Sequence, residues 1–120
     1  MNDARHNKDA EINSVIDPRN RKVKLYVGER DHIIMEHPVM GRNFTAIYDT
    51  IQSPKAIYDS GECDNREVYF KRSELATYGT KYYTKAIVEF DATRKEGYIV
   101  TAFPHEKEGG NIGERTYPDD

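Results

Sequence analysis

The chain has 120 residues, of which 37% are hydrophobic and 32% charged, so it is long enough for one domain with a real core. Its single cysteine, Cys63, excludes an internal disulfide framework and a cysteine-based zinc site. No apolar run approaches the roughly 20 residues of a membrane span, and the polar start MNDARHNKDAE cannot serve as the apolar region of a signal peptide.

The net charge of −3 at first argues against a nucleic-acid partner, but the charge is unevenly distributed. Residues 21–107 sum to +1, whereas residues 1–20 and 108–120 are acidic. RNA binding therefore requires that basic side chains gather on one face of the folded body.

The first half of the chain predicts a strand followed by two helices. Residues 1–20 are expected to be a flexible lead-in with a short helical turn at Glu11–Ile16, ended by the turn-forming cluster DPRN. The alternation in 21-RKVKLYV-27 predicts a strand. A short helix over 29–37 should close at His37-Pro38, because proline disfavours helix in the residue before it.

The clearest helix is predicted over 43–52, with Asn43 as its N-cap. Its apolar residues follow a helical spacing: Phe44, Ile47, Tyr48 and Ile51.

The second half of the chain predicts four strands, at 55–59, 65–72, 80–91 and 97–104. In the third, alternation places Thr84, Ala86 and Val88 on one face; in the fourth, it places Ile99, Thr101 and Phe103 together. Residues 108–120 are Gly-rich and acidic and should form a flexible tail. We therefore expect one α+β domain over 21–107, with an N-terminal strand and two short helices packed on an antiparallel sheet of about four strands.

Several kinds of chemistry are disfavoured by spacing. His32 and His37 are five residues apart, about 140° around a helix, so they do not converge on one metal ion. Cys63 lies in the acidic turn SGECDNR, which does not activate a thiol. The glycines of 109-GGNIG-113 follow a strand that ends in proline, not the strand–loop–helix of a phosphate-binding loop. We expect neither a metal nor a cofactor.

Proton-transfer chemistry remains, and RNA cleavage by the 2′-hydroxyl is one form of it that needs no metal. It requires an acid and a base, for which His32 and His37 are suited, and groups that stabilise charge on the phosphate. Lys71, Arg72, Tyr82 and Thr101 are candidates for the second role, although for each residue taken alone an ordinary structural role is favoured. Thr101 or a lysine in mid-sheet is costly unless something uses it.

The order HIIMEHPVM, REVYFKR, YYTKAIVEFD and GYIVTAFP over about residues 24–107 resembles the barnase/EndoU/colicin/RelE-like (BECR) ribonuclease superfamily, in its phage and polymorphic-toxin branch. The resemblance implies a metal-independent endoribonuclease, delivered into a target cell within a larger protein and acting on RNA, with tRNA as the expected substrate. A cognate immunity protein is the second partner that the resemblance implies.

Carried over by motif, the resemblance implies catalytic roles for His32, His37, Thr101 and either Lys71 or Arg72. Substrate-binding roles are expected for three further residues: Tyr82, Lys85 and His105. The family's acidic residue after His-Pro is Val39 here, and His105 is not a feature of the family. Two alternatives stay open: a catalytically inactive binding module on the same scaffold, and an immunity or antitoxin protein, which the acidic ends would suit.

Overall fold

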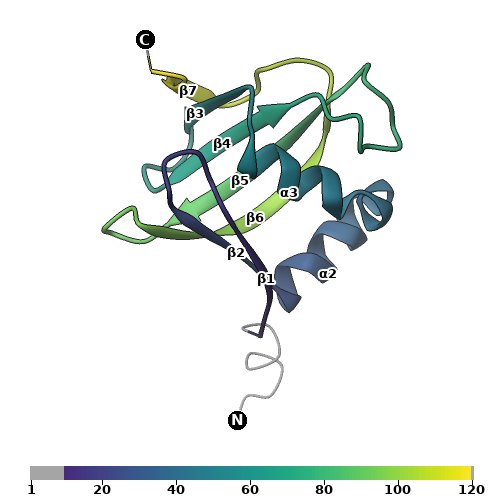
Figure 1. Ribbon diagram of the computed structural model, residues 1–120, viewed down its shortest axis with the longest axis horizontal. Coiled ribbons are helices and arrows are strands. Elements are labelled where there is room, and N and C mark those ends of the chain that lie inside the picture. Colours follow the sequence, from purple (N-terminus) through teal and green to yellow (C-terminus); the bar gives the residue numbers. More distant parts are fainter. Residues whose placement is uncertain (1–9, 120) are drawn as a thin grey trace.

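The computed structural model describes residues 10–119, and its centre is a seven-stranded sheet (Figure 1). The strands are β1 (Glu11–Ile16), β2 (Lys22–Tyr26), β3 (Ala56–Ser60), β4 (Arg66–Lys71), β5 (Tyr83–Phe90), β6 (Glu96–His105) and β7 (Ile112–Tyr117). Their order across the sheet is β1-β2-β6-β5-β4-β3-β7. The pair β2–β6 is parallel and all other pairs are antiparallel.

Three helical segments connect β2 to β3: α2 (Val27–Glu36), the 3-10 helix η1 (Pro38–Arg42) and α3 (Phe44–Gln52). Helix α3 crosses β4 and β5, and α2 lies beside β2 and β6, so the helices leave the opposite face of the sheet uncovered (Figure 1). Within residues 10–119, no helix is long and apolar enough to cross a membrane.

The α+β class, the strand at 21–27 and both predicted helices are confirmed. The predicted sheet of about four antiparallel strands is wrong in detail, because the sheet is mixed and has seven strands. The segment Glu11–Ile16, predicted as a helical turn, is strand β1, which pairs with β2. Part of the tail at 108–120, predicted to be flexible, forms β7 on the other edge of the sheet. Residues 1–9 of the predicted lead-in lie outside the described residues.

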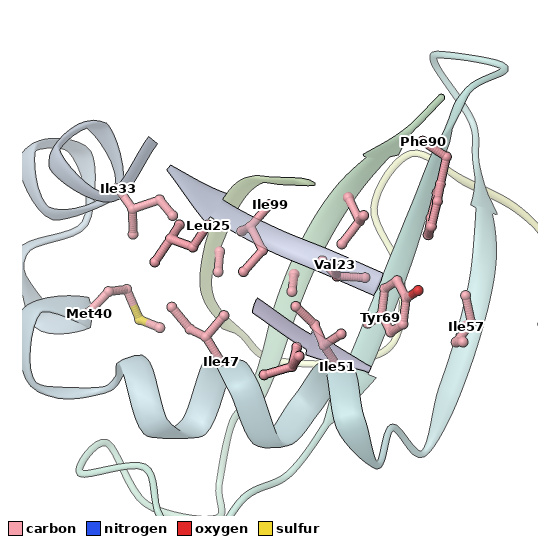
Figure 2. Close-up of a cluster of buried hydrophobic side chains, with 14 residues drawn as sticks. Val23, Leu25, Ile33, Met40, Ile47, Ile51, Ile57, Tyr69, Phe90 and Ile99 are labelled. Carbon is pink, nitrogen blue, oxygen red and sulfur yellow. The ribbon is translucent and has the colours of Figure 1, made fainter. Parts of the chain in front are cut away.

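The hydrophobic core lies between the helices and the sheet. Figure 2 shows Ile47 and Ile51 of α3 pointing toward the strands, with Ile33 of α2 and Met40 of η1 closing one end. All four side chains are fully buried. Burying one aliphatic side chain of this size stabilises the fold by roughly 1.5 to 3 kcal/mol.

Asn43 does not cap α3 with its side chain, as the sequence predicts; it joins the helix to the 73–79 loop. Its fully buried amide donates to the carbonyl of Val39 at 2.7 Å and to Thr77 Oγ1 at 2.9 Å. Its oxygen accepts from the backbone N–H of Thr77 at 2.6 Å. The side chain of Asn43 therefore bonds to Thr77, far along the chain, instead of capping the first turn of α3.

A buried charge network closes the other end of the core. The Arg21 guanidinium donates to both carboxylate oxygens of Glu67, at 2.8 and 2.9 Å, and to Asp17 Oδ2 at 3.0 Å. Tyr69 donates its hydroxyl to Asp17 Oδ2 at 2.6 Å, and burial and the Asp17 charge raise the pKa of Tyr69, so it stays protonated. Arg21 also lies over the ring of Phe90. This network ties the β1–β2 turn to β4.

A bulge in β6 sets which side chains reach the uncovered face. Ile87 pairs with Thr101, but Val88 pairs with Ile99, so Val100 is the extra residue. Ile99 and Ala102 are consequently both in the core, whereas Thr101 lies on the other face. The prediction that Ile99 shares a face with Thr101 is wrong for this reason.

Candidate functional site

The helix-free face of the sheet carries a polar centre on an apolar floor. The floor is formed by Val68, Phe70 and Tyr83, with Ile87 packed against them. Residues 106–111, which we call the strap, connect β6 to β7 and border a cavity of about 260 Å³ on this face. Lys85 and His105 both line that cavity.

Lys85 is the cation at the middle of this face. It is only 5% exposed, and burial lowers its pKa. Its ammonium donates to two strap carbonyls, those of Gly109 at 2.9 Å and Gly110 at 2.7 Å. A lysine has three N–H donors, so the third is left for another acceptor.

His105 lies beside Lys85, with its ring orientation fixed by the strap. Its Nδ1 is 2.7 Å from the carbonyl oxygen of Lys107, so we assign the Nδ1 proton to that bond, which leaves Nε2 with a free lone pair in the neutral ring. A methyl group built on Gly110 would lie 3.3 Å from His105 Nε2 and 2.9 Å from Lys85 Nζ. One atom-sized position therefore touches both nitrogens.

Thr101 lies on the same face of the sheet as Lys85, beside the cavity but not among the residues that line it. Lys85 pairs directly with Phe103 across β5 and β6, so Thr101 and His105 are its two diagonal neighbours. Such neighbours lie roughly 7 to 8 Å apart between their Cα atoms, within reach of a long side chain. Thr101 Oγ1 is the one buried side-chain polar atom with no hydrogen-bond partner among residues 10–119. An unpaired buried hydroxyl costs about 1 to 3 kcal/mol, which a ligand that pairs with it would recover.

Replacing Thr101 with valine, which has the same shape, should leave the free energy of unfolding unchanged or raise it by up to about 1 kcal/mol, because no hydrogen bond is lost. Thr84→Val is the matched control on the other face of the sheet, since the buried Thr84 hydroxyl bonds to Tyr78. That control should lose about 1 to 3 kcal/mol in urea denaturation. A larger loss for Thr101→Val than for Thr84→Val would contradict the assignment of Thr101 as unpaired.

His37 reaches the same centre from the first half of the chain. It follows α2, and its ring stacks on Phe103 with the centroids 4.9 Å apart and the planes at 26°. The ring of Phe103 also lies near that of His105, with the centroids 6.2 Å apart. Of the two histidines predicted as acid and base, His37 is therefore the one in contact with β6.

His32, the first predicted acid/base, lies outside this centre. It is on the exposed side of α2, where its Nε2 is 3.3 Å from Glu36 Oε1. The pair is one helical turn apart and more than half exposed, so it is an ordinary surface contact.

Lys71 and Arg72 also lie apart from Thr101. Lys71 pairs with Thr84 in the sheet register and so points to the helix face, where it forms an ion pair with Asp49 at 3.0 Å. Arg72 lies over the ring of Tyr83, with 4.6 Å from its Cζ to the centroid. Tyr82 lies just before β5 and is half-buried; it is Tyr83 whose ring joins the helix-free face.

The strap is the part of the centre that no sequence pattern indicated. Besides holding Lys85, it is anchored by Glu108, which accepts hydrogen bonds from Lys55 and from the hydroxyl of Tyr58. Its Gly-rich, charged composition is typical of a fraying tail, and the partners that order it are far away in the chain. The one sequence signal that could have indicated it is the adjacent pair Gly109 and Gly110, because glycine allows the backbone to approach another group closely.

Within the described part of the chain, no three His, Cys, Asp or Glu side chains gather as metal ligands would. The chain matches no protein-family model, and no curated protein or solved structure is significantly similar to it.

Proposed function

We propose that the protein is an endoribonuclease of the BECR type and that its active site is the helix-free face around Lys85, Thr101 and His105. The observation that carries the proposal is the combination of a buried lysine with a spare N–H, an unpaired hydroxyl and an imidazole with a free Nε2 on adjacent positions of one sheet face. These are the groups that cleavage by the 2′-hydroxyl requires.

In the proposed reaction, His105 Nε2 takes the proton of the 2′-hydroxyl, and the 2′-oxygen attacks the adjacent phosphorus. The phosphorus–5′-oxygen bond breaks, and an acid protonates the leaving oxygen; the candidate acid is His37, the histidine whose ring stacks on Phe103 at the edge of the cavity. Lys85 and Thr101 stabilise the charge that develops on the phosphate oxygens. The products are a 2′,3′-cyclic phosphate and a 5′-hydroxyl.

A bound substrate has to share Lys85 with the strap, because the carbonyl oxygens of Gly109 and Gly110 already accept hydrogen bonds from its ammonium. A phosphate oxygen either takes the third N–H of the ammonium or replaces the two carbonyls. We propose tRNA as the substrate class, the cytoplasm of a target cell as the place of action, and delivery within a larger toxin that a cognate immunity protein neutralises. These parts of the proposal rest on the sequence resemblance alone.

The experiment is incubation of the purified protein with total tRNA in EDTA, with analysis of the new RNA ends. We expect fragments that end in 2′,3′-cyclic phosphate, and we expect Lys85→Met to lower the cleavage rate by about 10²-fold or more, the scale of losing one transition-state donor. Lys95→Met is the matched control, because Lys95 is exposed in the turn between β5 and β6. RNA that stays intact at high protein concentration would overturn the proposal.

A second candidate, a non-catalytic binding module, is favoured by two observations: Lys85 is already held by two carbonyls, and Thr101 Oγ1 is shielded from solvent. The same experiment separates the two, since a binding module would retain tRNA in a filter-binding assay without producing new ends.

A further inference from the structure

A second hollow, of about 430 Å³, opens where β4 ends and β5 begins. Its lining is basic and contains no carboxylate: Ser53, Pro54, Lys55, Lys71, Arg72 and Tyr83. Three cations around one hollow, in a chain of net charge −3, are a local concentration of positive charge.

The three cations differ in how they are neutralised. Lys71 is paired with Asp49, and Lys55 with Glu108. Arg72 is exposed and, among residues 10–119, forms no ion pair with a carboxylate; its guanidinium lies over the ring of Tyr83. The ring holds the guanidinium in place while leaving its N–H donors open to a ligand.

The hollow is joined to the Lys85 centre by side chains and by the strap. Tyr83 packs edge-on against Phe70 with the centroids 6.1 Å apart, and Lys85 Nζ lies 5.7 Å from the centroid of Phe70. Glu108, which precedes the two glycines that hold Lys85, is the residue that neutralises Lys55. The strap therefore supplies hydrogen-bond acceptors to both places: the Glu108 carboxylate to Lys55 at the hollow, and two backbone carbonyls to Lys85.

We propose that this hollow binds a backbone phosphate of an RNA strand next to the phosphate at Lys85, with Arg72 as its main ligand and Glu108 as an internal competitor for Lys55. The inference rests on the proposed function for the identity of the strand. A phosphodiester fits because Arg72 offers a planar fork of donors and Lys55 becomes a second cation for the phosphate once Glu108 releases it.

The test is binding of a fluorescent 2′-O-methyl oligoribonucleotide, which cannot be cleaved through its 2′-oxygen, measured by anisotropy over a salt series. Arg72→Ala should weaken binding about threefold to fivefold, the scale of one exposed charge contact. The slope of log affinity against log salt should become shallower by about 0.7, as for one lost phosphate contact on a single strand. Arg42→Ala is the control, because Arg42 is exposed on η1 and makes the same charge change.

A second pair of variants tests whether Glu108 competes with the phosphate for Lys55. Glu108→Gln should tighten binding about threefold, because it releases Lys55, whereas Glu106→Gln makes the same charge change on the same strap at an exposed position and should tighten binding less. Equal effects of Arg72→Ala and Arg42→Ala, or no binding of the oligonucleotide by the unmodified protein, would overturn the inference.

The two proposals fail separately. If Arg72→Ala weakens binding of the oligonucleotide more than Arg42→Ala does but tRNA is not cut, the phosphate subsite stands and the nuclease assignment falls. If tRNA is cut but Arg72→Ala behaves as Arg42→Ala does, the nuclease assignment stands and the subsite falls.

Discussion

Replacing Arg21 with alanine is expected to lower the free energy of unfolding by about 3 to 5 kcal/mol, the cost of breaking a buried ion pair from one side. Glu67 is 5% and Asp17 is 3% exposed, and both depend on the Arg21 guanidinium. Arg94 also reaches Glu67, but nothing else with a positive charge contacts Asp17 among the described residues. The variant therefore leaves a buried carboxylate whose remaining partners are all neutral: the hydroxyl of Tyr69 and the backbone N–H groups of residues 19 and 21.

Urea denaturation followed by circular dichroism measures this loss. Arg66→Ala is the matched control, because Arg66 forms a single ion pair with Glu89 and both side chains are a quarter or more exposed. That variant should lose less than about 1 kcal/mol. Equal losses in the two variants would show that the Arg21 network adds nothing beyond a surface pair.

Local pattern was sufficient to predict the strands and helices whose side chains face the core. Strand β5 alternates as expected, with Ala86 and Val88 buried against the helices and Lys85 on the other side. The two edge strands were missed because their burial does not alternate: in β1 only Val15 is buried, and in β7 no residue is. Both strands form because a neighbouring strand pairs with them, and pairing leaves no alternation in an exposed edge strand: β1 pairs with β2 directly after it in the chain, and β7 with the distant β3.

The sequence names residues of the candidate site, but it does not predict how they are arranged. Thr101 was proposed from its motif, and Lys85 and His105 were proposed only as substrate-binding residues. His32 and His37 look equivalent in the sequence, but α2 turns His32 outward, whereas the chain reversal at Pro38 brings His37 onto Phe103. Lys71 was misplaced because the sheet register, which sets the face of each strand residue, cannot be read from one strand alone.

Replacing His105 is expected to have the largest effect on activity. If RNA is cut by the proposed mechanism, His105→Ala should lower kcat by about 10²-fold to 10⁴-fold, the usual contribution of a general acid or base. KM should change little, because the Lys85 ammonium and the Arg72 hollow, which attract the phosphates, are untouched. Single-turnover cleavage of an RNA oligonucleotide at saturating protein separates the two constants.

The histidine that the motif favoured supplies the control. His32→Ala removes the same side chain from the exposed side of α2, and we expect kcat within about twofold of the unmodified protein, since surface substitutions away from a site rarely matter. A large loss in His32→Ala with little loss in His105→Ala would move the active site from the helix-free face to α2. Because Lys107 contacts the ring of His105 through its backbone, Lys107→Ala should also retain activity, which distinguishes the imidazole from the strap side chains around it.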